Sequence, residues 1–122
     1  MKKILIIEDE EILLGLLQKR LIKEGYEVFV ALDGEEGLRM MGEIKPNLIL
    51  LDIVMPKIDG FGVLEIMRAD KKLKKLPVII ISNSGQPVEL DRVKKLGVKD
   101  WLIKTEFDPQ EIIKKVRKQI GN

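Results

Sequence analysis

Cysteine and histidine are both missing from the 122 residues of this chain. Without cysteine the chain can form neither disulfides nor thiolate metal sites, which fits a reducing compartment. Without histidine no imidazole can act as a base, a metal ligand or a phosphoryl carrier. Chemistry of these kinds must therefore use carboxylates or come from a partner.

Long apolar runs are also missing. The first run, Ile4 to Ile7, stops at Glu8 after four residues, short of the roughly 7–15 apolar residues of a signal peptide. No segment approaches the roughly 20 apolar residues that span a bilayer. We therefore expect a cytoplasmic protein with no membrane partner.

The charges nearly balance, with 22 Lys and Arg against 20 Asp and Glu and a formal net charge of +2. This balance gives no general attraction to nucleic acid, so we expect no direct nucleic-acid binding. Basic residues do gather at 68–75 and at 114–118. We interpret each group mainly as a solvated helix face, with a docking patch as the alternative.

The length fits one compact domain, in which short apolar runs alternate with segments of helical periodicity. The pattern predicts five strands, at 4–7, 28–31, 48–52, 78–81 and 101–103, each followed by a helix. Continuous apolar strands are typical of a parallel sheet covered on both faces, so the fold class is α/β. The most aliphatic strands, the first, third and fourth, should be central. Right-handed crossovers then predict a doubly wound, flavodoxin-like sheet in the order 2-1-3-4-5.

Polar side chains follow four of these strands at the point where each strand ends. Asp52 closes the third strand, and the others are Glu8 and Asp9, Ser82, and Lys104. The carboxyl ends of parallel strands meet at one edge, where ligands bind beside the switch point of the sheet. We therefore expect these groups to lie together.

Three crowded carboxylates repel one another unless a cation lies among them, and Mg²⁺ prefers such oxygen ligands. Asp52 would then be a nucleophile for a phosphoryl group, Lys104 would balance charge on its oxygens, and Ser82 would donate a hydrogen bond. Each residue also has a structural interpretation. Glu8 and Asp9 could be the acidic entry to a helix, Ser82 a turn residue and Lys104 a solvated charge.

These residues resemble the receiver domains of response regulators in two-component signalling, the CheY-like family, and the likeness covers residues 1–122. The matching motifs are the acidic pair Glu8-Asp9, the phosphoacceptor Asp52 with Met55-Pro56 and Asp59-Gly60, the switch residues Ser82 and Trp101, and Lys104. The resemblance implies a phosphoacceptor module rather than an enzyme, which assists its own phosphorylation and dephosphorylation at Asp52. The phosphoryl group would come from a partner histidine kinase or phosphotransfer protein. The implied cofactor is Mg²⁺, held by Glu8, Asp9, Asp52 and the backbone carbonyl of Val54.

The resemblance also implies how the signal leaves the domain. Phosphorylation would pull Ser82 toward the phosphate and turn Trp101 inward, which remodels the face formed by the fourth helix, fifth strand and fifth helix. A downstream protein target or a separate output domain would bind there. We expect no output domain within this chain.

Three residues depart from the family pattern. Thr105 follows Lys104 where a proline after a cis bond is usual; a cis bond before threonine would cost roughly 3–4 kcal/mol, so we expect a trans peptide or local strain. Asn83 replaces a smaller residue, and Trp101 is bulkier than the usual tyrosine or phenylalanine. These departures leave open a phosphorylation-independent interaction module of the same fold.

Two enzyme classes are further alternatives. An aspartate-based phosphatase would want a second aspartate two residues after the nucleophile, where Val54 stands. A flavin-binding protein would want a Gly/Ser/Thr-rich phosphate loop after the first strand, where the acidic residues 8–11 would repel an anion.

Overall fold

The structure is a computed structural model that describes residues 1–55, 57–83, 87–106 and 108–122. Five strands and five helices alternate along this described part of the chain. In order they are β1 (Lys3–Ile7), α1 (Glu11–Lys23), β2 (Glu27–Ala31), α2 (Gly34–Ile44), β3 (Leu48–Asp52), α3 (Gly60–Ala69), β4 (Val78–Ser82), α4 (Pro87–Lys95), β5 (Asp100–Ile103) and α5 (Pro109–Ile120). The predicted alternation of strand and helix is confirmed.

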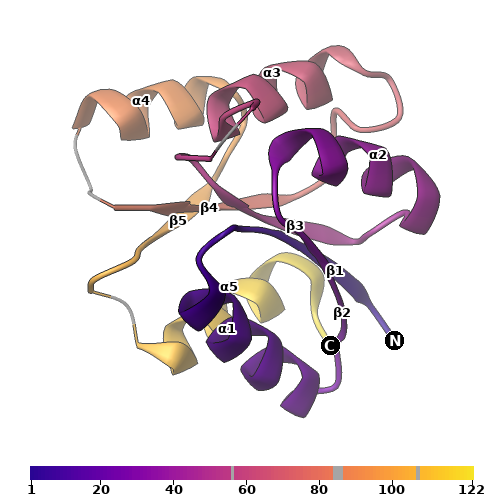
Figure 1. The fold of residues 1–122 in the computed structure, drawn as a ribbon, viewed down its shortest axis with the longest axis vertical. Helices are drawn as coiled ribbons and strands as arrows, with labels where there is room; N and C mark the ends of the chain where they lie inside the picture. The colour runs from indigo at the N-terminus through magenta and orange to yellow at the C-terminus, as the bar shows by residue number, and fades with distance from the viewer. Residues whose placement is uncertain (56, 84–86, 107) are drawn as a thin grey trace.

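The strands form one parallel sheet in the order β2-β1-β3-β4-β5. Helices α2, α3 and α4 cover one face of this sheet, and α1 and α5 cover the other (Figure 1). The predicted fold class, strand order and placement of β2 and β5 at the edges are therefore confirmed. Among the described residues, no helix is long and apolar enough to cross a membrane.

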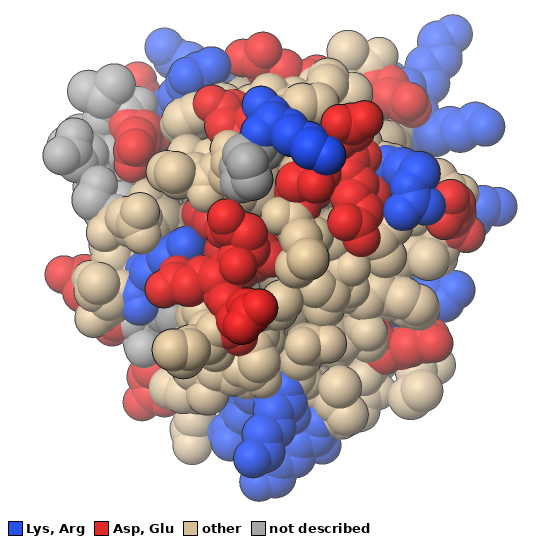
Figure 2. Space-filling model, viewed as in Figure 1, with Lys and Arg blue, Asp and Glu red and all other residues tan. Residues whose placement is uncertain are grey.

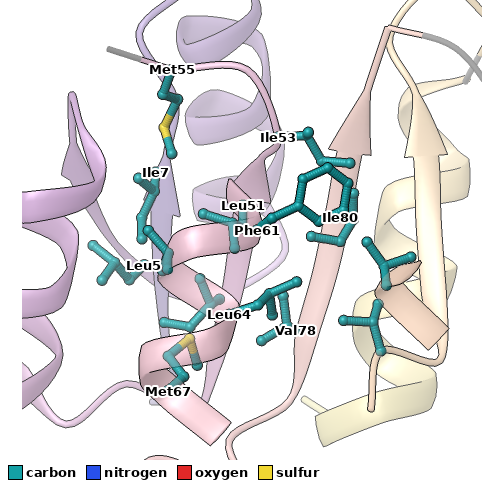
Figure 3. Close-up of a cluster of buried hydrophobic side chains, with 14 of the residues drawn as sticks. Leu5, Ile7, Leu51, Ile53, Met55, Phe61, Leu64, Met67, Val78 and Ile80 are labelled. Atoms are coloured by element: carbon teal, nitrogen blue, oxygen red, sulfur yellow. The ribbon is translucent and has the colours of Figure 1, made fainter. Parts of the chain in front are cut away.

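Two hydrophobic cores hold the layers together, one on each face of the sheet. On the first face, Phe61 and Leu64 of α3 point toward Leu51 and Ile80 of the central strands (Figure 3). Every residue of β3 and of β4 is buried. This burial on both faces explains why these strands are continuous apolar runs rather than alternating ones.

Helix α2 begins with an N-cap, in which the Asp33 side chain accepts a hydrogen bond of 2.8 Å from the backbone N–H of Glu36. Gly37 lies inside this helix, where glycine lowers helix propensity. The structure gives the reason for this glycine. A Cβ at position 37 would lie 2.4 Å from Cδ1 of Ile7, the last residue of β1.

Helix α5 also begins with an N-cap, in which Asp108 accepts a hydrogen bond of 2.8 Å from the N–H of Gln110, and Pro109 occupies the first helical position. Its inward residues Ile112, Ile113 and Val116 are buried. Four other apolar residues of the helices or their ends are only partly buried, and these are Leu38, Leu90, Leu96 and Ile120. Residues near helix ends or at the rim of a core keep part of their surface exposed.

Candidate functional site

The carboxyl edge of the sheet brings the predicted acidic residues together. Asp52 is the last residue of β3, while Glu8 and Asp9 directly follow β1. Each of the three can offer one carboxylate oxygen to a group whose atoms all lie within 4.8 Å of one another. Acidic side chains gather over the connection between β1 and α1 in the surface view (Figure 2). The predicted convergence of these three carboxylates is therefore present in the structure.

Backbone hydrogen bonds extend the sheet past the strand ends and fix this edge. The N–H of Glu8 donates to the carbonyl of Ala31 over 3.0 Å, and that of Ile53 donates to Ile81 over 3.1 Å. The N–H of Lys104 donates to the carbonyl of Ser82 over 2.8 Å. The residues that follow β1, β3 and β5 are thus held by the same ladder as the strands themselves.

Lys104 supplies the positive charge in this group. Its Nζ lies 3.0 Å from Oδ2 of Asp52, 3.0 Å from Oε1 of Glu8 and 3.2 Å from Oε2 of Glu10. Burial lowers the pKa of Lys104, but hydrogen bonds to Glu8 and Asp52 outweigh it and raise the pKa overall. The side chain therefore stays charged at every physiological pH.

Glu8 is fully buried, and its Oε2 accepts hydrogen bonds from the N–H groups of Asp9 at 2.9 Å and Glu10 at 3.2 Å. Desolvation and the nearby Asp52 carboxylate raise the pKa of Glu8 to about 7, although Lys104 acts in the opposite direction. Its Oε1 lies 3.0 Å from the Lys104 ammonium and accepts no hydrogen bond from a backbone N–H of the described residues. A buried carboxylate of this kind is stabilised by a cation beside it.

These observations fit Mg²⁺. Three carboxylates provide the hard oxygen ligands that this ion prefers, and the exposed Asp9 leaves one side open to the waters that Mg²⁺ retains. Val54 follows the site closely, since its N–H donates a hydrogen bond of 3.2 Å to Oδ1 of Asp52. This hydrogen bond holds Val54, whose backbone carbonyl is the predicted fourth oxygen ligand, next to Asp52.

Ser82, the last residue of β4, is buried at the same edge. Its hydroxyl donates a hydrogen bond of 3.2 Å to Oε2 of Glu89 in the first turn of α4. The predicted hydroxyl therefore lies at the expected strand end, with a contact to a helix that the sequence did not indicate.

Trp101 lies in β5 and is partly buried against the core beneath α3 and α4. The ammonium of Lys94, in α4, lies 5.3 Å from the centre of its indole ring, within the range of a cation–π interaction. Both predicted switch residues are thus connected to α4.

The departures from the family pattern have clear structural outcomes. No peptide bond between described residues is cis, so the bond between Lys104 and Thr105 is trans and this alternative of the prediction is confirmed. Asn83 is exposed at the end of β4. Pro56, part of the predicted phosphoacceptor motif, lies outside the described residues.

Two residues of the site were not predicted. The sequence placed Glu10 only among the acidic residues 8–11, but it contacts Lys104. Its position beside Glu8 and Asp9 was the available signal. Glu89 carried no comparable signal, because it lies seven residues after Ser82 and beyond a polar turn.

Comparison with protein families matches residues 4–117 to the response regulator receiver domain. The chain belongs to the receiver domains of response regulators. It is similar to the alkaline phosphatase synthesis transcriptional regulatory protein PhoP of Bacillus subtilis, with 38% identity over 95% of this chain and 47% of PhoP. It is also similar to RpaA of Synechocystis, a DNA-binding dual master transcriptional regulator, with 35% identity over 96% of this chain and 48% of RpaA.

Solved structures agree with this assignment of a receiver domain. The chemotaxis protein CheY4 of Vibrio cholerae superposes with a TM-score of 0.90 and 27% identity, covering 98% of each chain. In contrast, the chain spans about half the length of the curated relatives that it matches. The receiver domain is therefore the part that it shares with these transcriptional regulators.

Proposed function

We propose that this receiver domain is a phosphoacceptor switch in which Asp52 accepts a phosphoryl group from a partner histidine kinase or phosphotransfer protein. The observation that carries the proposal is the pairing of a nearly fully buried Asp52 with the Lys104 ammonium at 3.0 Å, beside two further carboxylates. A carboxylate needs no general base to act as a nucleophile, which fits a chain without histidine.

In the proposed step, a carboxylate oxygen of Asp52 forms a bond to the phosphorus of the donor's phosphohistidine. The phosphorus–nitrogen bond breaks, and its electron pair stays on the imidazole nitrogen of the donor, which then takes a proton. The Val54 N–H orients Asp52 through Oδ1. Lys104 would shift from Oδ2 toward the oxygens of the transferred group and compensate their charge.

The ion that fits this site is Mg²⁺, which when bound offsets the negative charge of the carboxylates and the phosphoryl group. We assign Glu8, Asp9, Asp52 and the Val54 carbonyl to hold it. Glu10 would help to keep Lys104 beside the site, because its carboxylate lies on the ammonium at 3.2 Å. The same arrangement would let the domain assist later loss of the phosphoryl group to water, so we regard it as a phosphoacceptor module rather than an enzyme with an external substrate.

The switch would act through α4. Movement of the Ser82 hydroxyl toward a phosphoryl group would break its hydrogen bond to Glu89, and a turn of Trp101 would change its contact with Lys94. Both changes affect the face formed by α4, β5 and α5. We propose this face as the surface whose shape reports phosphorylation.

We further propose that residues 1–122 form a single receiver domain and that the output lies elsewhere, in a further domain or in a separate protein. PhoP and RpaA are described as transcriptional regulators, and about half of each lies outside the matched region. In this proposal the receiver itself contacts protein partners rather than nucleic acid, and it acts in the cytoplasm.

The test is to incubate the protein with Mg²⁺ and a small-molecule phosphodonor and to record intact mass together with Trp101 fluorescence. The chain contains one tryptophan, so the optical signal has a single source. We expect the wild type to gain one phosphoryl group and its fluorescence to shift. The Asp52→Asn variant should do neither.

The matched control is Asp91→Asn, which removes an exposed carboxylate of α4 outside the site. This variant should be phosphorylated like the wild type. If the wild type gains no phosphoryl group from the small-molecule donor or from any histidine phosphodonor, the proposal fails and the phosphorylation-independent interaction module becomes the better explanation.

A further inference from the structure

A second polar site lies at the opposite edge of the sheet from Asp52. A cavity of about 500 Å³ opens where the amino ends of β4 and β5 meet the connection after α3, the turn after α4 and the end of α5. Five cationic side chains line it, and these are Arg68, Lys74, Lys75, Lys95 and Lys99. Its lining contains neither Asp nor Glu.

This one-sided lining contrasts with the near balance of charge over the whole chain, 22 basic against 20 acidic residues. Of the five cations that line the cavity, Lys95 forms an ion pair with a described carboxylate. Its Nζ lies 3.7 Å from Oδ2 of Asp91 on the surface of α4. The other four have no carboxylate within ion-pair distance among the described residues. Their charges therefore add to a positive potential over the cavity rather than cancel.

Arg68 is held rigidly in the wall of this cavity. Its Nε donates a hydrogen bond of 2.6 Å to the carbonyl of Leu96, and one terminal nitrogen donates to the carbonyls of Lys74 at 2.9 Å and Leu76 at 3.0 Å. These bonds join the connection after α3 to the turn after α4. The arginine thus fixes the positions from which the lysines project.

Gly97 allows the close approach of these two segments. Its φ is +82°, a conformation that side chains disfavour, and a Cβ there would lie 3.4 Å from Nε of Arg68. Burial lowers the pKa of Arg68, as expected for a cation paired with carbonyl dipoles rather than with a carboxylate. A positive charge partly removed from water, with no acidic partner, favours an anion nearby.

The floor of the cavity adds an apolar surface made by Leu76, Pro77, Val78 and Leu96. Cavities of roughly 300–1,000 Å³ with an apolar lining and a few convergent polar groups are typical of small-molecule sites. A single phosphate would use only part of this volume and of the five charges. A solvated helix face would explain the exposed lysines. It would not explain why Arg68 is fixed by three hydrogen bonds or why a cavity lies among these cations.

We propose that this cavity binds a small polyanion that carries two or more phosphate groups, either a nucleotide or an inorganic polyphosphate. The flexible lysines would contact the phosphates as point charges, and the apolar floor would take a base or remain in contact with solvent. Lys95 ends α4, whose first turn holds Ser82 through Glu89. An occupied cavity would therefore restrain the helix that the proposed switch must move.

The test measures binding of ATP and of pyrophosphate by calorimetry in metal-free buffer at low ionic strength, where the carboxylate site cannot recruit Mg²⁺–ATP. The cavity variant combines Lys74→Gln, Lys75→Gln and Lys99→Gln, all exposed positions. The matched control combines Lys19→Gln, Lys23→Gln and Lys114→Gln, three exposed lysines that do not line the cavity. Both variants lose the same charge, so a general electrostatic effect should change them equally.

We expect one ligand per chain, binding at least about tenfold weaker in the cavity variant and nearly unchanged in the control. The backbone amide signal of Gly97 should shift on binding in a nuclear magnetic resonance titration, and Asp52→Asn should bind like the wild type. Tighter binding of ATP than of pyrophosphate would indicate a nucleotide, and equal binding an inorganic polyphosphate. Absence of binding, or equal losses in both lysine variants, would overturn the proposal while leaving the phosphoacceptor proposal untouched.

Discussion

The hydroxyl of Ser82 donates a hydrogen bond to the carboxylate of Glu89, 3.2 Å away, and so joins the last residue of β4 to the first turn of α4. A hydrogen bond to a charged group stabilises a structure by about 1.5–3 kcal/mol. The bond therefore favours the arrangement in which Ser82 points toward the helix. A phosphoryl group on Asp52 would have to compete with Glu89 for the same hydroxyl.

The Glu89→Ala variant should therefore favour the phosphorylated conformation. We expect its affinity for fluoroberyllate, a mimic of the aspartyl phosphoryl group, to rise by about tenfold or more, because Ser82 no longer gives up a bond to Glu89. The measurement is a titration with Mg²⁺ and fluoroberyllate followed by Trp101 fluorescence. Asp91→Ala, which removes another carboxylate of α4, should bind like the wild type. Weaker binding by Glu89→Ala would show that Glu89 supports the switched state instead.

Lys104→Gln should separate metal binding from phosphorylation. The ammonium competes with a cation for Asp52 and Glu8, so its loss should increase Mg²⁺ affinity. The rate of phosphorylation should fall by about 10²–10³-fold, because a charge donor to the transferred group is lost. Magnesium titration and a time course of intact mass give the two quantities, with Lys114→Gln as the control. A parallel fall in both would contradict the assigned role of Lys104.

Glu8 should make the metal-free protein less stable as the pH rises. Its pKa is about 7 in the folded protein against an ordinary value of 4.5, so the folded state binds more protons than the unfolded state between these pH values. Its contribution to the unfolding free energy is fully present below pH 4.5 and is lost as the pH rises through 7. The loss should be on the order of 2 kcal/mol.

Glu8→Gln keeps the shape of the protonated acid and cannot lose a proton. The measurement is urea unfolding of both proteins in metal-free buffer at several pH values. The variant should gain stability relative to the wild type as the pH rises through neutrality. Parallel profiles for the two proteins would show that Glu8 does not titrate in this range.

Gly37→Ala should destabilise the domain by about 1–3 kcal/mol. The new methyl carbon would lie only 2.4 Å from Cδ1 of Ile7, which is too close for two carbon atoms. Gly42→Ala, in the same helix with no atom within 4 Å, should instead stabilise by about 0.5–1 kcal/mol. Thermal or urea unfolding measures both. In a double-mutant cycle, Ile7→Val removes Cδ1 and should recover part of the loss. Additive effects of the two substitutions would contradict a direct overlap.

The sequence predicts most of this fold because local patterns and general rules are sufficient for it. Fully buried strands appear as short aliphatic runs, and parallel strands place their carboxyl ends at one edge, so Glu8, Asp9, Asp52 and Lys104 could be expected to meet. The structure does bring them together. Their chemical roles stay predictions until phosphorylation is measured.

The remaining features depend on contacts between segments that are distant in the sequence. Gly37 weakens a helix when judged locally, and only the position of β1 shows that Ile7 requires it. The contact between Ser82 and Glu89 depends on the position of α4 beside the end of β4 and on the rotation of that helix. The basic cavity likewise depends on Arg68, which donates a hydrogen bond to the carbonyl of Leu96, 28 residues further along the chain. No periodicity or capping rule contains this information.

The two ends of the sheet carry charges of opposite sign, although the chain as a whole is close to neutral. Carboxylates gather where the strands end, and cations gather where β4 and β5 begin, four of them without a carboxylate partner among the described residues. The domain is therefore an electric dipole aligned roughly with its strands. In the field of a charged partner it should rotate before it makes contact, so that anionic surfaces meet the basic end while the acidic end stays exposed. Long-range orientation of this kind would weaken with added salt even if the net charge were unchanged.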